Sequence, residues 1–121
     1  MNSALAERTC TPCRGGIPPL TVEEAETFRL QAPEWALADG GTRIERTYRF
    51  KNFREAFAFV AKVAELAEAQ GHHPEIRFGW GYATGFAEHE EDHKGLHEND
   101  FIMAAKLDRT AGELKATQQL K

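Results

Sequence analysis

The feature that most constrains the fold of this chain is the corner Gly71-His72-His73-Pro74. The residue before a proline is pushed into an extended conformation and cannot continue a helix, and glycine often ends helices. The residues before Gly71 have the apolar spacing of a helix, and those after Pro74 have the character of a strand. The sequence therefore predicts that both histidines lie where a long helix turns into a strand.

The long helix before this corner is predicted to begin at Asn52, which with Glu55 has the pattern of an N-terminal cap. Apolar residues recur along it at three- and four-residue spacing and are expected to form its buried face: Phe53, Phe57, Val60, Val63, Ala64 and Ala67. A helix with one apolar face needs a second layer to cover that face, and the other predicted elements supply this layer.

The remaining elements complete an α+β pattern. Thr21 and Glu24 have the spacing of a capping box and predict a helix that ends near Ala32. Strands are predicted over residues 35–37, 42–50, 76–78 and 82–86, and a last helix from Glu98 to about Leu107. The order α-β-β-α-β-β-α predicts a four-stranded antiparallel sheet covered on one face by three helices.

With 121 residues the chain is expected to form one domain over residues 21–110, with a flexible N-terminal lead-in over 1–20 and a frayed C-terminal tail over 111–121. A net charge of -4 gives no basic field for nucleic acid. The sequence has neither a basic start followed by an apolar run nor an apolar segment of ~18 residues. It therefore predicts a cytoplasmic protein with no nucleic-acid or membrane partner.

Two cysteines, Cys10 and Cys13, form a CxxC pair in the lead-in. A structural zinc site needs four ligands, and the chain has no second cysteine pair to complete one. A redox pair is expected at a strand-to-helix junction, which this segment does not resemble. We expect two reduced, accessible thiols and no metal at this segment.

A family resemblance is carried by three segments, residues 50–53 (FKNF), 68–75 (EAQGHHPE) and 95–106 (GLHENDFIMAAK). Together with Trp35 they resemble the pterin-4a-carbinolamine dehydratase family, bacterial type. The resemblance implies dehydration of 4a-hydroxytetrahydropterin to quinonoid dihydropterin in pterin recycling, with no cofactor. It further implies a homodimer or tetramer formed by sheet-edge or helix pairing, and an aromatic amino acid hydroxylase as a pathway partner.

By this resemblance, His72 and His73 correspond to catalytic histidines, and Glu68 and Pro74 to substrate-binding residues of the same motif. The chemistry is consistent with this assignment. Loss of the hydroxyl from the pterin needs an acid to protonate the leaving oxygen and a base to take the N5 proton, and imidazoles do both near neutral pH. The alternative is that the two histidines only end a helix and bind backbone carbonyls.

The third histidine of the family pattern is the point at which this chain departs from it. That histidine stands four residues before Gly-Leu, a position that is Glu91 here. We predict that His89, seventeen residues after His72, takes its place as a catalytic residue, with the extra residue forming a bulge. His93 could reach the site only if the strand continues further. Without either, the site keeps two histidines and is slower or inactive.

The same departure creates a zinc-protease-like motif, because residues 89–93 (HEEDH) have the HExxH pattern. That motif binds zinc only when both histidines lie on one face of a helix. Gly95 would end such a helix two residues after His93, and His97 is too close to be the third ligand. We therefore predict a solvated acidic loop at this segment, with no metal.

The start of the last helix contains a further candidate. His97 is predicted as its N-cap and Asp100 as the third helical residue, with Leu96 and Phe101 as a hydrophobic staple. Asp100 is expected to cap the helix, and the resemblance places it near the pterin, where it could orient a histidine. Trp35 is expected either to stack on the pterin or to belong to the core.

A non-catalytic function is the main alternative to the dehydratase. Proteins of the resembled fold also act as a dimerisation cofactor for a transcription factor and as a RuBisCO assembly factor. The retained His72-His73-Pro74 motif favours the enzyme. The missing threonine-histidine pair at the third position favours a binding or assembly protein.

Overall fold

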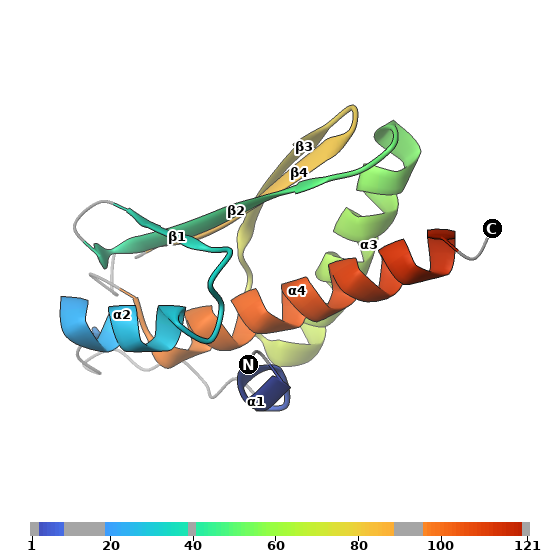
Figure 1. Cartoon of the computed structure of the whole chain (residues 1–121). Helices are drawn as coiled ribbons and strands as arrows, with labels where there is room; N and C mark the ends of the chain where they lie inside the picture. Colours follow the sequence, from blue (N-terminus) through green and yellow to red (C-terminus); the bar gives the residue numbers. More distant parts are fainter. Residues whose placement is uncertain (1–2, 9–18, 39–40, 89–95, 120–121) are drawn as a thin grey trace.

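The computed structural model describes residues 3–8, 19–38, 41–88 and 96–119. Its elements are α1 (Ser3–Ala6), α2 (Val22–Arg29), β1 (Ala36–Ala38), β2 (Arg43–Arg49), α3 (Phe53–Gln70), β3 (Glu75–Gly79), β4 (Tyr82–Glu88) and α4 (Glu98–Gln119) (Figure 1). From α2 to α4 the order is the predicted α-β-β-α-β-β-α. The fold class is therefore confirmed, with α1 as an addition at the N-terminal side.

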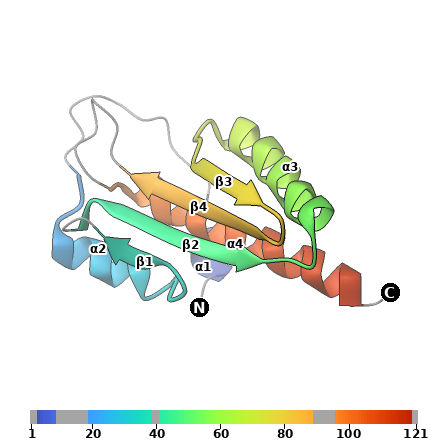
Figure 2. The same cartoon turned by 90° about the horizontal axis from the view of Figure 1, so that it is seen from above.

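The strands form an antiparallel sheet in the order β1-β2-β4-β3, so β4 lies inside the sheet and pairs with both β2 and β3. The long helices lie on one face of this sheet (Figures 1 and 2). Successive strand residues point to opposite faces, and Ile44 and Tyr48 of β2 are buried toward the helices. Their burial beside Ala83 of β4 places the core between the sheet and the helices.

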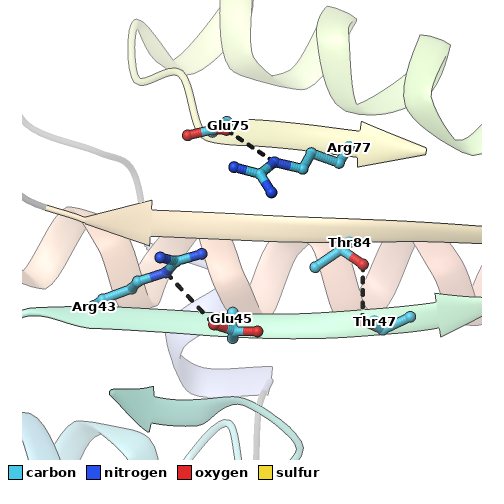
Figure 3. A network of polar contacts seen from close by, with 6 residues as sticks. All are labelled: Arg43, Glu45, Thr47, Glu75, Arg77 and Thr84. Carbon is cyan, nitrogen blue, oxygen red and sulfur yellow. Dashed lines mark hydrogen bonds and ion pairs between the residues drawn. The ribbon is translucent and has the colours of Figure 1, made fainter. Parts of the chain in front are cut away.

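The other face of the sheet is polar. Figure 3 shows three side-chain pairs on it: Arg43 with Glu45, Thr47 with Thr84, and Glu75 with Arg77. Between them lies Phe86, whose ring centroid is 4.3 Å from the guanidinium carbon of Arg43 and 5.0 Å from that of Arg77. Two guanidinium groups thus shield an aromatic ring on a face that none of the described helices covers.

The buried face of α3 matches the predicted face only in part: Val63 and Ala67 are buried and Val60 is partly buried. Phe53 and Phe57 are 50% and 55% exposed, and the residues that are buried toward the core are Ala56, Phe59, Val63 and Ala67. The two exposed rings instead contact Phe78 of β3, with ring centroids 5.5 Å and 6.2 Å apart. The prediction was wrong for Phe53, Phe57 and Ala64 because the spacing alone does not say which of two adjoining apolar stripes faces the sheet.

The ends of the fold also differ from expectation. The last helix continues to Gln119 instead of ending near Leu107. Gly112 lies inside it, but Ala111 is buried in the core cluster, and this packing outweighs the low helix propensity of glycine. The division into lead-in, domain and tail stays a prediction, although α1 and its buried Leu5 fall within the expected lead-in.

The predicted helix starts are confirmed. The Thr21 hydroxyl accepts the backbone N–H of Glu24 at 3.1 Å, and the Glu24 carboxylate accepts the N–H of Thr21 at 2.9 Å. At α3 the Asn52 side chain accepts the N–H of Glu55 at 2.9 Å.

Among the described helices, none is both long and apolar enough to cross a membrane.

Candidate active site

The corner between α3 and β3 has the geometry that its residues require. Gly71 ends α3 in the left-handed conformation, with φ of 65°, which glycine adopts without steric cost. The N–H groups of Gly71 and His72 both donate to the carbonyl of Ala67, so the last turn of the helix is closed. Pro74 then leads into β3. The two histidines are held on a short extended segment between two regular elements.

His72 is paired with a carboxylate of α4. Its Nε2 lies 2.9 Å from Oδ1 of Asp100, and the two side chains are 17% and 9% exposed. The other oxygen, Oδ2, accepts the backbone N–H of His97 at 2.9 Å, as predicted for a helix-capping residue. The Asp100 carboxylate thus caps α4 and also orients His72. It connects the start of α4 to the corner between α3 and β3.

His73 is paired with a carboxylate of the preceding helix. Its Nε2 lies 2.6 Å from Oε2 of Glu68, which belongs to the last turn of α3. These side chains are 60% and 77% exposed, so water screens this pair far more than the pair of His72 and Asp100. The corner therefore carries one sheltered and one open imidazole–carboxylate pair, on adjacent residues.

This arrangement suits proton transfer. An imidazole that donates Nε2–H to a carboxylate keeps its orientation and presents Nδ1 as the atom that takes up a proton. Histidine side chains held in this way act as general acids and bases near neutral pH. The structure brings together four of the predicted site residues, Glu68, His72, His73 and Asp100, and Pro74 is half-buried beside them.

Trp35 is placed in the core. Its indole N–H donates to Oδ1 of Asp108 at 3.0 Å, and its ring meets the ring of Tyr48 edge-on at 6.4 Å. The side chain is buried, which leaves little of its surface for a ligand. Of the two alternatives for Trp35, the core position is the one observed, and its stacking on a pterin stays a prediction.

His89, the predicted third catalytic histidine, lies outside the described residues, as do the whole HEEDH motif and the Cys10-Cys13 pair. In the part of the chain that is described, no three histidine, cysteine, aspartate or glutamate side chains come together as metal ligands. The expectation that no metal is bound at residues 89–93 stays a prediction.

Sequence reasoning missed Asp108. Its Oδ1 accepts three hydrogen bonds, from Trp35 Nε1 at 3.0 Å, from the guanidinium of Arg46 at 2.8 Å and from the hydroxyl of Tyr48 at 2.5 Å. Burial, together with the adjacent Asp108 charge and hydrogen bond, raises the pKa of the Tyr48 hydroxyl far above its usual value. The available signal was an acidic residue three positions after the apolar run of residues 101–105 in the predicted last helix.

The fold and the corner define a class of protein: a small α+β domain whose antiparallel sheet is covered on one face by helices, with two histidine–carboxylate pairs at a helix–strand corner. The family model of pterin 4 alpha carbinolamine dehydratase matches residues 18–110. This chain belongs to that family.

Known relatives agree with this assignment. The chain is 56% identical over 111 residues to a protein of Methylococcus capsulatus that is provisionally named pterin-4-alpha-carbinolamine dehydratase, covering 91% of this chain and 96% of that protein. A provisionally named dehydratase of an Azoarcus species is 55% identical over 113 residues, with 93% and 96% covered.

Two solved structures share the fold. One is a transcriptional coactivator/pterin dehydratase from Brucella melitensis, with a TM-score of 0.69 and 34% identity, covering 78% of this chain and 99% of that chain. The other is a pterin dehydratase-like protein identified as a RuBisCO assembly factor in the alpha-carboxysome, with a TM-score of 0.57 and 26% identity, covering 65% and 90%.

Proposed function

We propose that this protein catalyses the dehydration of 4a-hydroxytetrahydropterin to quinonoid dihydropterin. In this reaction the bond between C4a and the hydroxyl oxygen breaks, the leaving oxygen takes a proton and departs as water, and N5 loses a proton. The observation that carries the proposal is the pair of adjacent histidines, each bound to its own carboxylate at one corner. Such a site can supply one proton and remove another in a single turnover.

We assign different roles to the two histidines on the basis of their surroundings. His72 is the base for the N5 proton, because its sheltered hydrogen bond to Asp100 holds the ring in one orientation. His73 is the acid for the leaving hydroxyl, because its exposed position gives the departing water a path to solvent. Protons then exchange with water to restore both rings. Glu68 and Pro74 are proposed to border the bound pterin.

The test is a stopped-flow measurement of quinonoid dihydropterin formation from 4a-hydroxytetrahydropterin. The wild-type protein is expected to accelerate it, and His72→Ala and His73→Ala are each expected to lower the rate by at least about a hundredfold. His97→Ala is the matched control, since it removes a nearby imidazole but keeps the backbone N–H that Asp100 binds. Unchanged rates in both histidine variants would refute the catalytic assignment.

A second candidate is a non-catalytic binding or assembly protein of the same fold. The relative described as a RuBisCO assembly factor supports it, because 90% of that chain is covered by this one. The discriminating result is the wild-type rate. If the wild-type protein accelerates dehydration no more than the His72→Ala and His73→Ala variants do, the binding function is favoured.

We further propose a homodimer, a cytoplasmic location and a pathway link to an aromatic amino acid hydroxylase. Within the described sheet, β3 is an edge strand, and edge strands tend to pair with further strands. Phe53 and Phe57 of α3 lie beside this edge with half of their surface exposed. Pairing of β3 with a second β3 would extend the sheet and bury these rings.

A further inference from the structure

The short helix α1 lies outside residues 18–110, which the family model matches. It packs on α4, on the side of that helix away from the sheet (Figures 1 and 2). Leu5 of α1 is 0% exposed and belongs to the core cluster. A segment outside the residues that the family model matches therefore contributes a core side chain.

Polar contacts attach α1 to both ends of a two-turn stretch of α4. The Arg8 guanidinium forms an ion pair with the Glu98 carboxylate, and the Lys106 ammonium donates to the carbonyl of Ala6 at 2.7 Å. Residues four apart share a face of a helix, so Glu98, Ile102 and Lys106 lie in one row. Since Ile102 is buried between the two attachment points, α1 covers this row.

The same stretch of α4 carries the carboxylate of the candidate site. All seven residues from Asn99 to Ala105 are buried, although a helix on one side of a sheet normally buries only one stripe. Burial on all sides requires a cover on the side away from the sheet, and α1 lies there. Asp100, which binds His72 and the N–H of His97, lies within this doubly covered stretch.

We infer that α1 is a positioning element for the His72–Asp100 pair: by covering the outer face of α4 it holds the first turn of that helix, and with it the Asp100 carboxylate, against the corner. The inference rests on the proposed function for its catalytic consequence. A displacement of a catalytic group by about 1 Å can cost about a hundredfold in rate. In this inference Leu5, Arg8 and Lys106 are positioning residues that act through α4.

The test uses the full-length protein with Leu5→Asp, which places a charge in the contact between α1 and α4. The His97 amide donates to Asp100, so its hydrogen-exchange rate reports on the first turn of α4. We expect this rate to rise at least about tenfold, the ¹⁵N shift of His72 Nε2 to change, and kcat to fall about tenfold with a smaller change in KM.

Two controls separate positioning from general stability. Glu7→Gln changes an exposed charge next to α1 and is expected to change none of these values. Phe59→Leu weakens the core from the first half of α3 and is expected to lower the melting temperature without a selective rise in His97 exchange. If Leu5→Asp matches Phe59→Leu in both His97 exchange and the His72 shift, the inference is wrong.

If the Leu5→Asp variant does not fold, variants of the Arg8–Glu98 ion pair test the inference instead. Arg8→Glu is expected to speed His97 exchange about two- to fivefold at low salt, and Arg8→Glu with Glu98→Arg to restore it. No effect of the single change, or no restoration by the double change, would overturn the inference. Hydrogen exchange of the His97 amide can be measured even if the wild-type protein has no dehydratase activity. The positioning role of α1 and the proposed dehydratase function can therefore be refuted separately.

Discussion

At the scale of single residues, the two histidines differ chiefly in how firmly their carboxylates are held. Asp100 is bound by the His97 N–H and is nearly buried, so it can keep one orientation of His72. Glu68 is mostly exposed, and its contact with His73 competes with water. Orientation by a fixed carboxylate matters most when the imidazole must hold a single tautomer.

This difference predicts unequal effects of removing the two carboxylates. Asp100→Asn is expected to lower kcat by at least about tenfold, because an amide cannot hold the same His72 tautomer as a carboxylate. Glu68→Gln is expected to lower kcat only a few-fold, since water can replace an exposed partner. Steady-state rates of both variants, with melting temperatures to verify folding, provide the comparison. Equal losses would contradict the assigned roles.

A second residue-scale prediction concerns the histidines outside the described residues. His89 directly follows Glu88, the last residue of β4, whereas His93 follows three acidic residues that favour water. His89→Ala is expected to lower the dehydration rate about a hundredfold, and His93→Ala to leave it unchanged. Dehydration rates of the two variants, measured under the same conditions, test which histidine takes the third position. A larger loss in His93→Ala would assign the third position to His93 instead.

At the scale of elements, Asp108 connects α4 to the sheet. Its carboxylate accepts hydrogen bonds from Arg46 and Tyr48 of β2 and from Trp35, just before β1. Asp100 and Asp108 lie eight residues apart on the same helix. The part of α4 between these two residues is therefore fixed to the corner by Asp100 and to β2 by Asp108.

The Asp108 contact predicts a loss of stability in alkali. The pKa of the Tyr48 hydroxyl is raised in the folded protein above the value of 10.0 that an unperturbed tyrosine has. A group with a raised folded pKa stabilises the fold fully below its unfolded pKa and less as pH rises above it. The free energy of unfolding is expected to fall above about pH 10 by about 1.4 kcal/mol per pH unit. Tyr48→Phe should remove this slope in urea titrations; an unchanged slope would contradict the prediction.

At the scale of the whole molecule, the arrangement of faces governs assembly. Helices cover one face of the sheet, and the other face carries the polar pairs of Figure 3. The guanidinium groups of Arg43 and Arg77 lie over Phe86 there, so this face is a poor apolar docking surface. The β3 edge, flanked by Phe53 and Phe57, combines an edge strand with exposed rings. This combination favours pairing through the edge over pairing through either face.

The dimer proposal is tested by Phe57→Glu, which places a charge beside the β3 edge. We expect the wild-type protein to have the mass of a dimer or a larger oligomer in light scattering, and the variant to have the mass of a monomer. Leu30→Glu is the matched control, because Leu30 is an exposed apolar residue of similar size at the end of α2. A monomeric wild-type protein, or a variant that still dimerises, would rule out this interface.

The sequence by itself determined the local features of this protein. The caps at Thr21 and Asn52, the stop at Gly71 and the extended residue before Pro74 depend on side chains within a few positions of one another. Their order along the chain was sufficient for the fold class. The same motif residues also placed His72 and His73 at a helix–strand corner.

Only the tertiary structure decided which distant groups meet. Asp100 lies 28 positions from His72, and Asp108 lies 60 from Tyr48, so no local pattern relates them. The orientation of Phe53 and Phe57 on α3 and the burial of Leu5 likewise depend on what packs against each helix. Periodicity shows that a helix has an apolar face, but the free energy of packing against the sheet and the other helices selects which side is buried and which carboxylate a histidine meets.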